Sequence, residues 1–212
     1  MTDTMAPTHA ASLLIERLPV DAAVQDLEDI ASIQAELAIA FQLLEAGVRE
    51  SDRGFLISAY KPDNFRDFLR REGLILGARQ TAGGRLVGYL LGNSGQTFIA
   101  NHPTTQLHWD SDESKREYGG RYAAGQFTYL DQIGVAASLH GAGIARQLHA
   151  HFLALVERPI LAAIVQAPIQ NRRSTVFFSK LGYRPIGMFY TAEFKGLRDV
   201  RSAVLALPRD TA

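Results

Sequence analysis

The sequence of 212 residues contains no cysteine. This absence excludes disulfide bonds, thiolate metal sites and covalent catalysis by a cysteine nucleophile. An excess of charge of one sign is also missing, because 22 lysine and arginine residues balance 22 aspartate and glutamate residues. Such a chain does not present the broad basic surface that binds nucleic acid or an anionic membrane. Its partners are therefore expected among small molecules and proteins.

Long hydrophobic runs and targeting signals are lacking as well. The apolar stretches at 37–44 and 153–165 are interrupted by polar residues and fall short of the roughly 20 residues that span a bilayer. Residues 1–11 lack the basic and apolar regions of a secretory signal. We therefore expect a cytoplasmic protein with no membrane partner, with a flexible N-terminal tail at 1–11 and a short tail at 209–212.

The sequence does contain enough apolar residues, 47%, for one well-packed α/β domain at 12–208, and little room for a second. Apolar runs bounded by turn residues predict strands at 12–20, 74–78, 85–91, 127–135, 159–166, 183–193 and 199–207. Helical periodicity predicts one long or two joined helices at 21–47, and further helices at 61–71, 143–155 and 172–181.

The most informative stretch runs from Phe127 to Leu155. Its first part is a predicted buried strand, and from Gly143 onward the apolar spacing becomes helical. Glycines in the turn between them let several backbone N–H groups point at one place, where the helix dipole also favours negative charge. A phosphate or pyrophosphate would suit this turn, although Gly141 and Gly143 can equally serve only to make a tight turn.

A dinucleotide-binding fingerprint fits the turn less well. Arg146 stands where a third glycine is expected, and the segment lies too late in the chain for the usual first βαβ unit. An oxidoreductase that binds NAD would also need an acidic ribose ligand, and Glu157 lies too close, at the end of the same helix. The sequence does not favour this class.

The turn resembles the acyl-CoA signature of the GCN5-related N-acetyltransferases (the GNAT superfamily), which is Gln or Arg, two variable positions, Gly, one variable position, then Gly or Ala. Gly143 and Ala145 match it, whereas His140 replaces the usual Gln or Arg. The segment from Asn171 to Tyr183, with its Phe-Phe pair and Leu-Gly-Tyr, resembles the second signature of the family. The order and separation agree, and the two signatures cover about the C-terminal half.

The resemblance implies an α/β (α+β) fold with a mixed, mostly antiparallel sheet of six to seven strands and helices on both faces. It implies acetyl-CoA as co-substrate, with its pantetheine arm between two diverging strands. The residues that it implies at the cofactor site are Ile133, Gly134, Val135, His140, Gly141, Ala142, Gly143, Ile144, Ala145, Arg146, Asn171, Ser174 and Phe178. Asn171 and Ser174 also suit helix capping alone. Arg172 and Arg173 are further candidates for the phosphates.

Transfer to an amine needs a base, because an alkyl ammonium with a pKa near 10 must lose its proton before it attacks. Asp131 is the candidate, and regular alternation would point it to the same face as Ile133 and Val135. Its alternative role is a rim carboxylate that holds the substrate ammonium. The family's acidic tyrosine falls at Phe178, which has no proton to donate. Tyr183, Tyr190, Tyr129 and solvent remain as candidates for the catalytic acid, of which we retain Tyr183, and a thiolate can also leave without a strong acid.

The connection 96–126 is long for a compact domain and contains a tryptophan and several histidines and tyrosines. We interpret it as a lid or specificity insertion with some helix near 111–118. The predicted protein is an acetyl-CoA-dependent N-acetyltransferase that acts on a primary amine of a small molecule, a protein N-terminus or a lysine. The alternative is a non-catalytic acyl-CoA-binding or regulatory module of the same fold. No metal site is expected, and a homodimer is compatible with the sequence.

Overall fold

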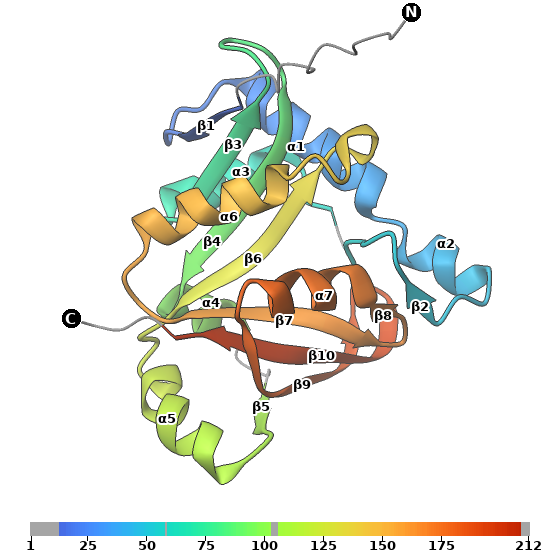
Figure 1. The fold of residues 1–212 in the computed structure, drawn as a ribbon, viewed down its shortest axis with the longest axis vertical. Helices are drawn as coiled ribbons and strands as arrows, with labels where there is room; N and C mark the ends of the chain where they lie inside the picture. The colour runs from blue at the N-terminus through green and yellow to red at the C-terminus, as the bar shows by residue number, and fades with distance from the viewer. Residues whose placement is uncertain (1–12, 58, 103–105, 209–212) are drawn as a thin grey trace, which may run out of the picture.

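The computed structural model describes residues 13–57, 59–102 and 106–208. The tails predicted at 1–11 and 209–212 lie outside the described residues. At the centre is an eight-stranded sheet of order β1-β3-β4-β6-β7-β10-β9-β5 (Figure 1). Its strands are β1 (Leu14–Arg17), β3 (Leu74–Arg79), β4 (Leu86–Ser94), β5 (Gln106–Trp109), β6 (Thr128–Val135), β7 (Ile160–Ala167), β9 (Arg184–Phe194) and β10 (Leu197–Leu207).

Neighbouring strands of this sheet are antiparallel, with the exception of the parallel pair β6 and β7. A separate parallel pair, β2 (Glu50–Ser51) and β8 (Gln170–Asn171), lies beside it. The prediction of a mixed, mostly antiparallel sheet is therefore confirmed. The predicted count of six or seven strands is too low, because the connection at 96–126 supplies a strand of its own.

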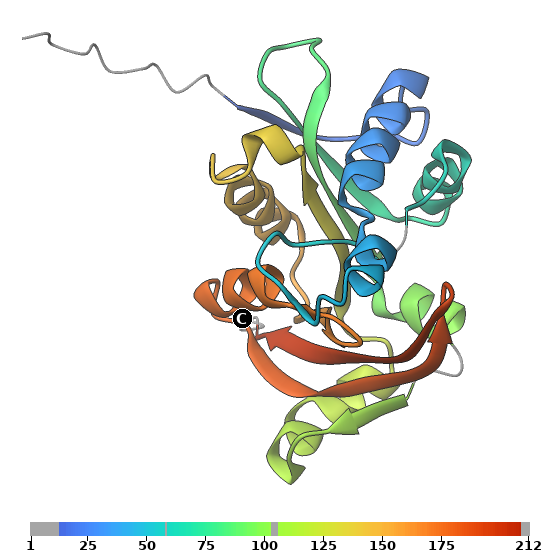
Figure 2. The ribbon, with the colours of Figure 1, turned by 90° about the vertical axis from the view of Figure 1, so that its right-hand side faces the viewer.

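Helices cover both faces of the sheet, as predicted, with α1 and α3 on one side and α6 and α7 on the other (Figure 2). The helices are α1 (Val24–Leu37), α2 (Ala40–Glu45), α3 (Pro62–Arg70), α4 (Gly95–Asn101), α5 (Asp112–Ala123), α6 (Ile144–Leu155) and α7 (Arg172–Lys180), with a short 3₁₀ turn η1 (Ala137–Leu139). The helical pattern at 21–47 thus forms two helices, α1 and α2. No helix in the described ranges is long and apolar enough to cross a membrane.

Two apolar clusters hold these layers together. Leu148 and Phe152 of α6 are fully buried against the sheet on one face, and Ile30 of α1 and Phe65 of α3 are buried on the other. Burying a side chain of this size contributes about 1.5–3 kcal/mol. The spacing of four between Leu148 and Phe152 places both side chains on one stripe of α6, so the helix lies flat on β3 and β4.

The parallel pair in the middle of the sheet is short. In the part of the chain that the structure describes, β6 pairs with β7 over Thr128–Leu130 and Ile160–Ala162, and the ladder then ends. Beyond it, β6 stays on β4 and β7 stays on β10, so the two strands diverge as a wedge (Figure 1). The expected pair of diverging strands is therefore present.

The connection predicted as a lid is largely a structured extension of the sheet. Ser94 and Ser111 accept hydrogen bonds from the Thr97 and Ser114 N–H groups and so cap α4 and α5. Strand β5 pairs with β9 at the edge of the sheet. Of the described residues of this connection, Phe98 and His102 line the cavity described below.

Candidate active site

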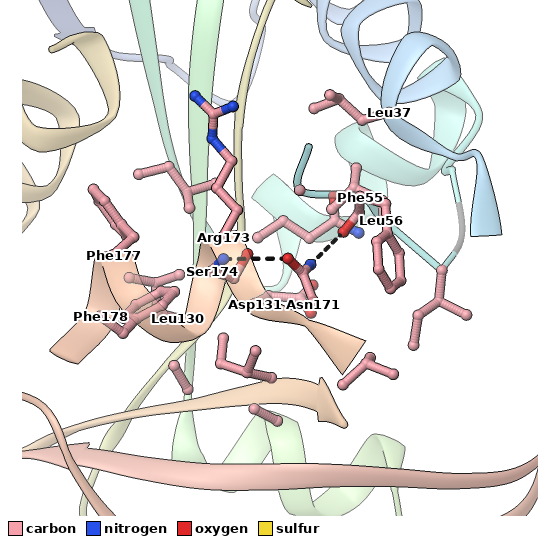
Figure 3. A pocket seen from close by; sticks show the side chains of 18 of the residues that line it. Leu37, Phe55, Leu56, Leu130, Asp131, Asn171, Arg173, Ser174, Phe177 and Phe178 are labelled. Carbon is pink, nitrogen blue, oxygen red and sulfur yellow. Dashed lines mark hydrogen bonds between the residues drawn. The ribbon is translucent and has the colours of Figure 1, made fainter. Parts of the chain in front are cut away.

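A cavity of about 660 Å³ follows the wedge between β6 and β7. Its wall is formed by the ends of these strands, the glycine turn before α6, the start of α7, the segment around Phe55 and the α4 helix. Figure 3 shows how side chains from these distant parts of the sequence converge on it. The turn and α7 form one end of the cavity, which we call the turn end. Asp131 and the aromatic residues around it form the other, which we call the aromatic end.

Gly141 and Gly143 shape the turn end. Their φ angles are +91° and +78°, values that residues with a side chain rarely adopt, and Gly143 is the N-cap of α6. A Cβ atom built on either glycine would meet no described atom within 4 Å. The two glycines are therefore required by the backbone conformation, and the space in front of the turn is open to a ligand.

The His140 side chain connects this turn to the end of β6. Its Nε2 lies 3.0 Å from the Val135 carbonyl oxygen, so the ring is engaged within the protein. The predicted cofactor residues that line the cavity are Ile133, Val135, His140, Gly141, Gly143, Ile144, Ala145, Arg146, Asn171, Ser174 and Phe178. Gly134 and Ala142 do not line it. Gly134 packs on the Tyr89 ring, and Ala142 lies exposed on the outside of the turn.

Asn171 has a structural role at the start of α7. Its Oδ1 accepts the Ser174 N–H at 3.2 Å, and its Nδ2 donates to the Phe55 carbonyl at 2.9 Å (Figure 3). The buried amide therefore caps the helix and also ties it to a segment 116 residues earlier. Because both of its polar atoms are used in this way, Asn171 positions the wall of the cavity, and the neighbouring Ser174 lines the cavity directly.

The arginines near the turn end differ in their surroundings. Arg146 and Arg173 line the cavity, and the Arg173 side chain packs against the backbone at Gly54. Arg172 does not line it. Its guanidinium instead forms exposed ion pairs with Glu50 at 2.7 Å and Asp52 at 3.5 Å. Of these two predicted phosphate candidates, Arg173 therefore lies at the cavity and Arg172 does not.

Asp131 owes its direction to an irregularity of β6. Leu91 of β4 lies opposite Gln132, and Gly92 lies opposite Leu130, so Asp131 is one extra residue between them. A bulge of this kind re-aims side chains and breaks strict alternation. The regular alternation on which the predicted parity of Asp131 with Ile133 and Val135 rested is therefore interrupted, although all three residues line the cavity. Ile133 and Val135 pack with the α6 cluster, while Asp131 meets Tyr60 and His102.

The surroundings of Asp131 suit a base. The carboxyl is partly exposed to the cavity and otherwise desolvated, and this burial raises its pKa to about 6. The charge of His102 and a hydrogen bond from the Tyr60 hydroxyl act in the opposite direction and limit the rise. At pH 7 the carboxylate is therefore mostly ionised, yet it is far more basic than an ordinary aspartate.

Three side chains around Asp131 were not singled out by sequence reasoning. Burial raises the pKa of Tyr60, as does the neighbouring Asp131, so its hydroxyl stays protonated and can donate to that carboxylate. His102 Nδ1 lies 2.9 Å from the Phe98 carbonyl, and its ring stacks on the Phe98 ring at 4.6 Å. The apolar pair Phe98-Ile99 after a Ser94 cap is the signal from which α4 could have been found.

Tyr183 lies outside the cavity. Its hydroxyl is 3.0 Å from His149 Nε2 in the core, and its ring packs edge-on against Phe178. It is not among the described residues that line the cavity, so it is not placed to protonate a leaving group there. Phe178, against which Tyr183 packs, does line the cavity. No group of three or more His, Asp or Glu side chains in the described ranges could hold a metal ion.

No family model matches this sequence, and no curated protein matches it. Solved structures do. An N-acetyltransferase from Staphylococcus aureus Mu50 is 18% identical, with 93% of this chain and 98% of that chain covered and a TM-score of 0.58. The acetyltransferase yncA from Salmonella typhimurium, solved with acetyl-CoA, is 15% identical over 94% and 95%, also with a TM-score of 0.58.

The ribosomal-protein-S18-alanine N-acetyltransferase from Escherichia coli is 14% identical, with 95% of this chain and 96% of that chain covered and a TM-score of 0.58. These likenesses extend over nearly the whole length of each protein, whereas the identities are low. What they share with this chain is the arrangement of the sheet and its helices. The chain therefore has the fold of the GCN5-related N-acetyltransferases.

Proposed function

We propose that this protein transfers an acetyl group from acetyl-CoA directly to a primary amine. One observation carries the proposal: a single cavity connects the open glycine turn with the carboxylate of Asp131 through the wedge between β6 and β7. The first part suits a phosphate-bearing co-substrate, and the second suits an amine that must lose a proton. The wedge brings the two ends together.

The turn end supplies what acetyl-CoA requires. Backbone N–H groups around Gly141 and Gly143, at the positive end of α6, would hold the pyrophosphate. Arg146 and Arg173 would add charge-assisted hydrogen bonds to phosphate oxygens. An extended arm in the wedge could bond to the backbone of β6 and β7 where their own ladder has ended, as an added strand does. Acetyl-CoA supplies the activated thioester.

Asp131 would act as the base. An alkyl ammonium has a pKa near 10 in water, and a desolvated site lowers that value while the carboxylate attracts the proton. Asp131, with its pKa raised to about 6, takes the proton from the ammonium either directly or through one water molecule. Tyr60, which stays protonated, orients the carboxylate by donating to it.

The remaining requirements are met by backbone and solvent. Negative charge that develops on the thioester oxygen needs N–H donors. Beyond Leu130, β6 stays paired with β4, while its other edge faces the wedge instead of β7 and could supply them. The departing thiolate belongs to a thiol with a pKa of about 8.5, so it leaves without a strong acid. This account needs no proton from Phe178 or Tyr183.

A non-catalytic acyl-CoA-binding module is the second candidate, and the buried phenylalanine at position 178 favours it. A catalyst and a binding module both bind acetyl-CoA through the turn. They differ at Asp131, because only a catalyst loses turnover when that carboxylate is removed. The amine itself belongs to a small molecule, a protein N-terminus or a lysine side chain.

The test combines binding and turnover on the intact protein. Isothermal titration with acetyl-CoA, CoA and NAD is expected to show micromolar affinity for the first two and none for NAD. Thiol release is then followed with a disulfide reagent, and because the protein has no cysteine, the colour reports CoA alone. Asp131→Asn should abolish amine-dependent release while it leaves the affinity for acetyl-CoA unchanged. A folded protein that does not bind acetyl-CoA would overturn both candidates.

A further inference from the structure

The aromatic end of the cavity carries a single negative charge. Among the described residues that line the whole cavity, Asp131 is the only carboxylate. An acceptor with two or more ammonium groups would bury a second cation there without a partner, which is costly. Polyamines and aminoglycosides are therefore poorly matched to this cavity.

The arginines that line the cavity are Arg53, Arg146 and Arg173, whereas the positive charge that acts on Asp131 is that of His102. Arg146 adjoins the glycine turn, and Arg53 adjoins Gly54, against which Arg173 packs. Beside Asp131 the basic side chain is His102, whose Nδ1 faces the Phe98 carbonyl. Because a carbonyl can only accept, Nδ1 carries the hydrogen and is already engaged by Phe98. The aromatic end therefore offers a carboxylate no permanent cation.

Aromatic rings form most of the wall around Asp131. The rings of Phe98 and Tyr129 lie 4.1 Å apart between centroids, and Phe98 also stacks on Phe189 at 5.7 Å. Tyr60, which bonds to Asp131, adds a further ring. All four residues line the cavity. Such walls bind a flat apolar body and also attract a cation that lies against a ring face.

We infer that the acceptor is a monoamine with an apolar, aromatic body and no carboxylate, held with its ammonium on Asp131. This inference rests on the proposed acetyl transfer and names the substrate class of the same site. It follows from the lone carboxylate and the rings that surround it. The ammonium donates to Asp131, and the rest of the molecule is desolvated against Phe98, Tyr129 and Phe189.

The experiment compares amines in matched pairs on the wild-type protein with saturating acetyl-CoA. 2-Phenylethylamine and phenylalanine differ by one carboxylate, and butylamine and 1,4-diaminobutane differ by one ammonium. In each pair the second compound is expected to have a kcat/KM lower by about 100-fold or more, because the extra charge is buried without a partner. 2-Phenylethylamine should also exceed butylamine by about 10-fold or more, since it buries a ring. A ratio within about 3-fold in either charge pair overturns the inference.

Binding of the same four amines to the protein–CoA complex, by calorimetry, separates this inference from the proposed function. Thiol release can fail for every amine while 2-phenylethylamine still binds at least about 10-fold more tightly than phenylalanine. In that case the proposed acetyl transfer is wrong and the inferred ligand class stands. If neither the release nor the binding distinguishes the pairs, the ligand class is wrong. Phe98→Leu should lower the affinity for 2-phenylethylamine about 10-fold. Phe41→Leu, at an exposed position, is the control and should leave this affinity unchanged.

Discussion

The side-chain nitrogen of Gln34 on α1 donates to the side-chain oxygen of Gln132 on β6 at 2.6 Å. Gln34 in turn accepts the Tyr60 backbone N–H at 2.6 Å, and because a backbone N–H can only donate, the orientation of both amides is fixed. The Tyr89 hydroxyl adds a second hydrogen bond to the same Gln132 oxygen. Through this chain of contacts, α1 holds both Tyr60 and the strand that carries Asp131 in register.

Removal of this link should loosen the site and the fold together. Gln34→Met keeps the side-chain volume but leaves the Tyr60 N–H and the Gln132 oxygen with fewer partners. The expected loss is about 1–3 kcal/mol of unfolding free energy, or several degrees in Tm. Urea and thermal unfolding measure it, with the exposed Gln42→Met on α2 as control. Equal stability of the two variants would contradict the role given to the Gln34 amide.

Asp131→Asn should stabilise the protein at neutral pH while it removes activity. The folded-state pKa is raised from 3.8 to about 6, so the folded protein binds the proton more tightly than the unfolded chain. Stability attached to Asp131 is thus complete below about pH 4 and is lost as the pH rises through about 6. The expected gain at pH 7 is about 2 kcal/mol after allowance for partial exposure to the cavity. Unfolding at pH 7 and pH 4 tests the sign, because the gain should disappear at the lower pH.

The pH dependence of wild-type kcat follows from the same carboxyl. The base must be ionised, so kcat is expected to rise through an apparent pKa of about 6 and then to level off. In Asp131→Asn, both the turnover and its rise with pH should disappear. A wild-type profile that is flat from pH 5 to pH 8 would show that another group accepts the proton.

Gly143 and Gly83 form a matched pair. Both have positive φ, +78° and +70°, and at both a Cβ atom would meet no described neighbour within 4 Å. Gly143→Ala and Gly83→Ala should therefore each lower the free energy of unfolding by about 1–2 kcal/mol, through backbone strain alone. Titration with acetyl-CoA should show weaker binding for Gly143→Ala only, because Gly83 lies in the β3–β4 hairpin. Equal affinities of the two variants would remove the glycine turn from the binding site.

Arg172 and Arg173 are neighbours on α7 with different expected effects. Arg173→Ala should lower the affinity for acetyl-CoA about 10-fold and reduce the salt dependence of acetyl-CoA binding, because Arg173 lines the cavity. Arg172→Ala breaks exposed pairs with Glu50 and Asp52 and should change affinity and stability little. Calorimetry at two salt concentrations measures both variants, and the reverse order of effects would argue against this location for the phosphates.

Tyr183→Phe tests the residue that the sequence favoured as the acid. The structure predicts a loss of about 1 kcal/mol of stability, since a buried hydrogen bond to His149 disappears. Turnover should change by less than about 3-fold, because Tyr183 is not among the described residues that line the cavity. A large fall in kcat with unchanged stability would restore Tyr183 as a catalytic group.

Much of the fold was predictable because its signals are local. The change from strand to helix at Gly143, the cap at Asn171 and the closing hairpin were all recognised from neighbouring residues. Strand β5 was missed, although Gln106 to Trp109 alternates polar and apolar residues, because four residues at a sheet edge give a weak signal. The turn end of the cavity was likewise largely predicted, since its residues lie close together in the sequence.

The aromatic end was beyond local reasoning. Tyr60 and His102 join Asp131 from elements far away in the chain, and no periodicity relates them. The direction of the Asp131 side chain depends on one extra residue in β6. A strand that is buried on both faces has no alternation of apolar and polar residues, so the sequence gives no sign of the bulge. His149 is buried with Tyr183, a pairing that the sequence does not show.

The short β6–β7 ladder also has a mechanical consequence. The sheet consists of two four-stranded halves, β1-β3-β4-β6 and β7-β10-β9-β5. Within the sheet, only three paired residues on each of β6 and β7 connect these halves in the described part of the chain. A ligand that bonded to both strands in the open part of the wedge would take the place of the missing ladder and would stiffen this connection. Amide hydrogen exchange at Ile133 and Ile164 should therefore slow when the wedge is filled, by more than in the antiparallel pairs on either side.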